Sequence, residues 1–121
     1  MSETVEVMED LEIIKVTSVG QITENDLQKS RMLIREICRQ RGFNKILVDA
    51  TRLTNRLPTM VAYDHAAMLT SDDILSRAKY AIIASEHTDK NLYFFETAAI
   101  NRGARVSIFS SGEKALSWLM D

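Results

Sequence analysis

The spacing of hydrophobic positions changes several times along the chain, and each change marks a new element. Within residues 1–18, two short apolar runs separated by acidic residues predict an antiparallel hairpin that turns near Glu9. Apolar positions then recur at helical intervals between Leu27 and Cys38, which predicts a helix that ends at Gly42. The chain is therefore expected to open with two strands and a helix.

This first helix has a start signal and a defined apolar stripe. Thr23 is placed to cap it by accepting a backbone N–H of the first turn. The residues expected on its buried face are Leu27, Ile34 and Cys38, with Leu33 and Ile37 beside them.

Strands and helices alternate over the rest of the chain. Strands are expected at residues 45–50, 79–85 and 105–109. A helix is expected after each strand, starting near Pro58, near Asp89 and after a cap at Ser110 or Ser111. The order ββαβαβαβα predicts a single α/β domain over residues 1–121, with a mixed, mostly parallel five-stranded sheet, an antiparallel N-terminal hairpin and four helices.

Composition narrows the classes of function. The chain has 121 residues, of which 45% are hydrophobic and 26% charged, and its net charge of −2 gives no bulk attraction to nucleic acid. No apolar run approaches the roughly 20 residues of a membrane helix, and the acidic start does not resemble a signal peptide. The single cysteine, Cys38, suits a reducing compartment and leaves no multi-cysteine metal site. We expect a cytoplasmic protein without a membrane span.

Several segments of the chain are similar to one known family. They are Gly20 and Ile22-Thr23 with Asp26-Leu27, then Leu47-Val48-Asp49, Tyr80-Ala81-Ile82-Ile83, Arg105-Val106-x-Ile108-Phe109 and Glu113-Lys114-Ala115-Leu116-x-Trp118-Leu119. Together they resemble the SpoIIAA-like family, which is grouped with the STAS and Sec14-like folds. The resemblance covers nearly the whole chain and consists mostly of turns, caps and core positions.

The resemblance implies a non-enzymatic regulatory or protein-binding domain, because the best-understood relatives antagonise anti-sigma factors. Sec14-like relatives bind lipids, so a small apolar or lipid-like ligand is the alternative. In the anti-sigma factor antagonists an Asp-Ser pair opens the helix after the central strand, and phosphorylation of that serine switches partner binding. The matching stretch here reads Leu57-Pro58-Thr59, so the acid is absent and only Thr59 offers a hydroxyl. Thr59 is the candidate for a phosphate switch, and local hydrogen bonding near the helix start is the alternative.

Polar side chains also follow the expected strands at their carboxyl ends, where open α/β sheets bind ligands. They are Asp49, Thr51, Arg52, Ser85, Glu86, His87, Ser110 and Ser111. We predict a binding crevice formed by Asp49, Thr51, Arg52 and His87, with Thr59 nearby. The alternative is that Asp49 only accepts loop N–H groups and that His87 lies in a solvated turn.

Catalysis and metal binding find little support in the sequence. No serine lies in a Gly-x-Ser-x-Gly elbow, so the acid, histidine and hydroxyl residues near the strand ends do not make a recognisable triad. His65 lies on a helix with Leu69, not a second ligand, four residues later. We therefore predict no catalytic residue, no metal site and no cofactor.

The first helix also carries a basic stripe, because Arg31, Arg35 and Arg39 recur every four residues. Such a stripe could meet an acidic partner, lipid phosphates or RNA. RNA is the weakest of these, since no aromatic residues are interleaved for stacking. The alternative is a solvated helix face, partly neutralised by Glu36.

The third helix is more apolar than one buried face requires. Its stripe toward the sheet is Leu92, Phe95 and Ala99, which leaves Tyr93, Phe94 and Ile100 uncovered. A second copy of the chain or another protein is the simplest cover, and a symmetric homodimer is the commonest assembly. The alternative is a small apolar ligand in a pocket that Met60, Tyr63 and Met68 would help to line.

Overall fold

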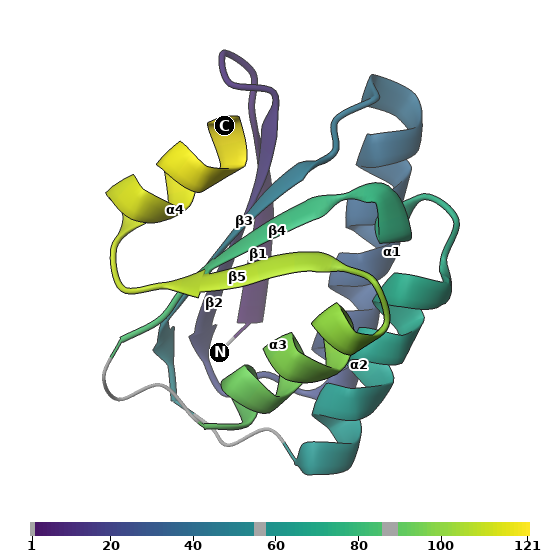
Figure 1. Cartoon of the computed structure of the whole chain (residues 1–121), viewed down its shortest axis with the longest axis vertical. Coiled ribbons are helices and arrows are strands. Elements are labelled where there is room, and N and C mark those ends of the chain that lie inside the picture. Colours follow the sequence, from purple (N-terminus) through teal and green to yellow (C-terminus); the bar gives the residue numbers. More distant parts are fainter. Residues whose placement is uncertain (1, 55–57, 86–89) are drawn as a thin grey trace.

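The structure is a computed structural model that describes residues 2–54, 58–85 and 90–121 (Figure 1). In these ranges the strands are β1 (Ser2–Met8), β2 (Ile13–Gly20), β3 (Lys45–Leu53), β4 (Lys79–Ile83) and β5 (Arg105–Phe109). The α-helices are α1 (Glu24–Arg41), α2 (Thr59–Ser71), α3 (Asn91–Asn101) and α4 (Gly112–Met120), and a short 3-10 helix, η1, spans Leu75–Arg77. The predicted element order is confirmed, and η1 is an addition to it.

The strands form a single mixed sheet in the order β1-β2-β3-β4-β5. Strand β1 pairs with β2 in the antiparallel sense, and the other pairs are parallel. The predicted N-terminal hairpin and mostly parallel sheet are therefore confirmed. Because every parallel crossover moves to the next position in the same direction, right-handed connections place α1, α2 and α3 on one face. Figure 1 shows these three helices on that face and α4 on the other.

Each face of the sheet has its own apolar core. The face under α1, α2 and α3 carries the larger core, in which sheet residues such as Ile46 and Ile82 cluster with buried residues of the three helices. Under α4, the smaller core joins Ile13 and Leu47 to Leu119. The alternation of Ile46 and Leu47 between the two cores explains why β3 is apolar on both faces.

Helix ends follow the signals in the sequence. Thr23 accepts the backbone N–H of Asp26, and the Asp26 carboxylate accepts the backbone N–H of Thr23, which makes a capping box at the start of α1. Gly42 ends α1 with φ +71°, in the left-handed region that glycine tolerates. Ser111 caps α4 by accepting the Lys114 N–H.

Three expectations about the elements were wrong, and one of them concerns β4, which ends at Ile83 and not at residue 85. Leu33 is exposed, and Ser30 takes a buried position on α1 instead, because the buried stripe follows the spacing of Leu27, Ile34 and Cys38. Strand β3 continues to Leu53, three residues beyond the expected end, since β2 runs on to Gly20 and still pairs with it. Within the described ranges, no helix combines the length and hydropathy needed to cross a bilayer.

Candidate functional site

The larger core contains a cavity of about 90 Å³ between the sheet and helices α1, α2 and α3. Its walls are mostly apolar and include Ile34, Leu69 and Phe95 from the helices and Ile46 and Ile82 from the sheet. A cavity with such walls has few hydrogen-bond partners to offer water, so it is suited to an apolar group.

Part of the cavity wall is polar. The polar side chains that line it are Glu3, Ser18, Ser30, Arg31 and His65. The hydroxyl of Ser18, which is buried, donates to the Glu3 carboxylate at 2.7 Å. These groups come from β1, β2, α1 and α2, so the polar part of the wall is assembled from segments distant in the sequence.

Arg31 and His65 are joined by a hydrogen bond of 2.7 Å between Nη1 and Nδ1. A guanidinium can only donate, so Nδ1 of His65 must be the acceptor, and the neutral ring carries its proton on Nε2. Burial, followed by the positive charge of Arg31, lowers the pKa of His65 to about 3. Burial also lowers the pKa of Arg31, against the opposing charges of Glu24 and Glu3.

The His65 ring is held on its other side by α3. It stacks on the Phe95 ring, with the ring centroids 5.2 Å apart and the planes inclined by 27°. Since Phe95 is buried and lines the cavity, this stacking fixes the imidazole at the cavity wall. His65 thus connects helices α1, α2 and α3.

A second hollow, a groove of about 360 Å³, lies between α1 and α2 on the outer side of this pair. Leu27, Arg31 and His65 belong to the linings of both the groove and the cavity. These three side chains therefore form the partition between the groove and the cavity, and the polar bond within the partition is the one between Arg31 and His65.

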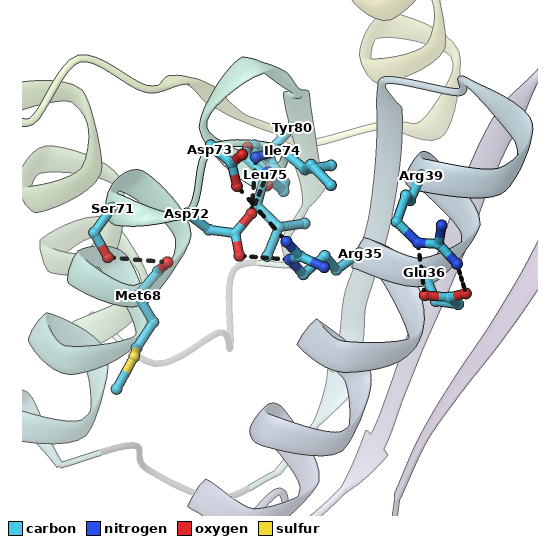
Figure 2. A network of polar contacts seen from close by, with 10 residues as sticks. All are labelled: Arg35, Glu36, Arg39, Met68, Ser71, Asp72, Asp73, Ile74, Leu75 and Tyr80. Atoms are coloured by element: carbon cyan, nitrogen blue, oxygen red, sulfur yellow. Dashed lines mark hydrogen bonds and ion pairs between the residues drawn. The ribbon is translucent and has the colours of Figure 1, made fainter.

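An ion-pair network around Arg35 and Asp72, two residues that line the groove, joins α1 to the segment before η1 (Figure 2). Arg35 Nε donates to Asp72 Oδ2 at 2.8 Å, and Arg35 Nη2 lies 3.6 Å from Asp73 Oδ1. The other Asp72 oxygen accepts the backbone N–H groups of Ile74 and Leu75 at 2.8 and 2.9 Å. Burial works to raise the pKa of Asp72, but these N–H groups and the Arg35 charge outweigh it and hold that pKa below its ordinary value.

The predicted basic stripe is thus largely engaged within the chain. Arg31 donates to His65, Arg35 pairs with Asp72 and Asp73, and Arg39 pairs with Glu36 one turn away. The expected neutralisation by Glu36 is present at Arg39 (Figure 2). Binding of an acidic partner along the stripe stays a prediction, and it would compete with these internal contacts.

The predicted strand-end crevice has a different geometry from the one expected. Thr51 and Arg52 lie within β3, not in a loop, and both are exposed. Asp49 Oδ1 accepts the Thr51 N–H at 3.0 Å and the Thr51 hydroxyl at 2.6 Å. Burial acts to raise the pKa of Asp49, but the bonds from Thr51 and the charges of Lys15 and Arg52 lower it overall. His87 lies outside the described residues.

The topology also removes the reason for expecting ligands at the carboxyl ends of the strands. Ligands of open α/β sheets bind where the strand order reverses, and the parallel strands here follow one another without reversal. Asp49, Thr51 and Arg52 line neither the cavity nor the groove. Their role in binding stays a prediction.

Thr59 is the first residue of α2 and is exposed, directly after Pro58. A phosphate there would lie at the positive end of the helix. The phosphate switch stays a prediction.

The exposed face of α3 agrees with the sequence prediction. Leu92, Phe95 and Ala99 are buried, whereas Tyr93, Phe94 and Ile100 are 49%, 39% and 48% exposed. Met60, Tyr63 and Met68 are exposed and do not line the cavity, whereas Met68 lines the α1–α2 groove. Their part in a small-ligand pocket stays a prediction.

The contact between Arg31 and His65 was not predicted from the sequence. Arg31 was assigned to a basic stripe, and His65 was considered only as a metal ligand. The two residues are 34 positions apart in the chain, so no local pattern connects them. Over residues 2–54, 58–85 and 90–121, no group of three or more His, Cys, Asp or Glu side chains could hold a metal ion.

Comparison with known proteins supports the fold. No family model matches the chain, and no curated protein matches it. Among solved structures, the chain is similar to the crystal structure of an uncharacterised protein of the DUF3478 family, with a SpoIIAA-like fold, from Shewanella loihica PV-4. The TM-score is 0.64 at 19% identity, and the match covers 98% of this chain and 92% of the other. The chain therefore has the SpoIIAA-like α/β fold.

Proposed function

We propose that this chain is a non-enzymatic, cytoplasmic regulatory domain, resembling anti-sigma factor antagonists, that binds protein partners and pairs with a second copy of itself. The observation that carries the proposal is the exposed apolar face of α3, formed by Tyr93, Phe94 and Ile100. Aromatic side chains contribute strongly to protein interfaces, and the exposure of three large apolar residues on one short helix favours a covered surface.

Helix α2 packs beside α3 (Figure 1) and also exposes two large apolar side chains, Met60 and Tyr63. A symmetric pairing of two copies is the simplest cover, because the same patch then meets itself about a two-fold axis.

One of the two edges of the sheet, strand β5, is a less suitable surface for self-association. The Ile108 N–H of this strand donates to the Glu96 carboxylate of α3 at 3.0 Å. A charged side chain on an edge N–H opposes pairing with another strand. This arrangement favours the helix face over the β5 edge as the contact between copies.

The experiment that tests this proposal compares the mass in solution of the wild type with that of the Phe94→Lys and Tyr93→Glu variants. We expect the wild type to sediment as a dimer and both variants to shift to the single-chain mass, since a charge would be buried in the interface. Met120→Lys is the matched control, because Met120 is 44% exposed on α4 at the opposite face of the sheet. The proposal fails if Phe94→Lys, Tyr93→Glu and the wild type share one mass.

A second candidate function is the binding of a small ligand, favoured by the apolar cavity with polar groups at part of its wall. Ligand binding in the cavity does not require the α3 face, so each of the two proposed functions can be true without the other.

A further inference from the structure

We propose that the cavity binds a short-chain aliphatic carboxylate, whose tail occupies the apolar space and whose carboxylate pairs with Arg31 in place of His65. This inference rests on the second candidate function and names its ligand class.

Arg31 is the group that selects the head of the ligand. Among the described residues no carboxylate lies within ion-pair distance of it, whereas Arg35, Arg39 and Arg41 all form such pairs. Its described hydrogen-bond partner is the neutral Nδ1 of His65, which occupies one of five N–H donors. A half-buried guanidinium with a neutral partner is well suited to receive an anion.

The exchange of partners is chemically favourable. A carboxylate accepts two parallel N–H bonds from a guanidinium, and these charge-assisted bonds are stronger than the bond to a neutral imidazole. His65 would remain held by its stacking on Phe95 after Arg31 turns to the ligand. The bond that separates the groove from the cavity is thus the bond that the ligand would replace.

Apart from Arg35, the other charges around Arg31 are acidic and do not themselves attract an anion. Glu3 already accepts the Ser18 hydroxyl, and Asp72 is paired with Arg35. Glu24 and Asp64 also line the groove, so an anion gains its binding energy from direct contact with Arg31 and not from the field of the groove. A cationic head group would meet Arg31 itself and is disfavoured at this position.

The size of the cavity sets the length of the tail. A cavity of about 150 Å³ holds the six carbons of benzene, so the 90 Å³ found here corresponds to about four carbons. Pentanoate, with four carbons beyond its carboxylate, is therefore the matched probe. Propanoate lacks two of the methylenes and, at about fourfold per buried methylene, should bind about 15-fold more weakly.

The closing experiment titrates pentanoate, propanoate, pentanol and pentylamine into the full chain at pH 7 and follows the amide resonances of cavity residues by NMR. We expect pentanoate to bind about tenfold or more tightly than pentanol, because only the carboxylate forms charge-assisted bonds with Arg31. Arg31→Gln should lose about the same factor for pentanoate and leave pentanol unchanged. Arg39→Gln, an exposed arginine of the same helix, should bind pentanoate as the wild type does.

Each contrary result has a distinct meaning. Equal binding of pentanol and pentanoate by the wild type overturns the carboxylate assignment while leaving the second candidate function intact, and this comparison needs no variant. Unchanged pentanoate affinity in a folded Arg31→Gln also overturns it. Absence of binding by all four probes overturns both the carboxylate assignment and the second candidate function.

Discussion

Arg31 donates a hydrogen bond to Nδ1 of His65 over 2.7 Å, so a permanent cation and a titratable ring share one contact at the cavity wall. Protonation of His65 would remove the acceptor and place two positive charges side by side. The neutral ring is therefore part of the folded structure, and its ordinary tendency to protonate below pH 6.5 is opposed by folding.

The first prediction is a loss of stability in mild acid. The pKa of His65 is about 3 in the folded chain against an ordinary value of 6.5, so between these values the unfolded chain binds the extra proton and stability falls as the pH falls. From pH 7 to pH 5 this single group should remove about 2 kcal/mol from the free energy of unfolding. Urea denaturation at the two pH values measures the loss.

His65→Asn provides the comparison, because its amide oxygen can accept from Arg31 and does not titrate. The variant should lack the His65 part of the pH dependence, so its stability should change less between pH 7 and pH 5 than that of the wild type. Parallel pH profiles for the two proteins would contradict the account of the Arg31–His65 contact.

The second prediction concerns Asp72, which joins α1 to η1 through Arg35 and two backbone N–H groups (Figure 2). Asp72→Ala leaves those donors without their partner and should lower the free energy of unfolding by about 2 kcal/mol. Asp72→Asn keeps an acceptor oxygen for the N–H groups and should cost about half as much. Asp73→Ala, at an exposed position, is the control and should change stability by less than about 0.5 kcal/mol. An effect of Asp72→Ala as small as that of Asp73→Ala would show that the Asp72 contacts do not stabilise the fold.

The third prediction concerns the capping box of α1. Thr23→Ala removes the side-chain acceptor for the Asp26 N–H and should cost about 1 kcal/mol in thermal or urea unfolding. Thr23→Ser retains the hydroxyl and should remain close to the wild type. A loss of stability in Thr23→Ser as large as in Thr23→Ala would mean that the hydroxyl is not the group that matters.

The fold could be predicted from the sequence where local chemistry determines it. Thr23 and Gly42 mark the ends of α1 through the backbone groups next to them, and the alternation of Ile46 and Leu47 defines the two faces of β3. The end of β3 was misjudged because pairing with β2, and not the side chains of residues 51–53, continues the strand.

The candidate site was less predictable because its contacts are long-range. The partner of Arg31 is set by how α1 and α2 lie on the sheet, and no local pattern at Arg31 or His65 reveals it. The exposed residues of α3 were predictable, since the positions of Leu92, Phe95 and Ala99 assign the buried face and leave Tyr93 and Phe94 outside.

The central claim, that the chain pairs with a second copy of itself, is tested most directly by native mass spectrometry of the wild type over a wide range of protein concentration. The account predicts a species at twice the 13.7 kDa chain mass that dissociates on dilution. A single-chain mass at every concentration would contradict it.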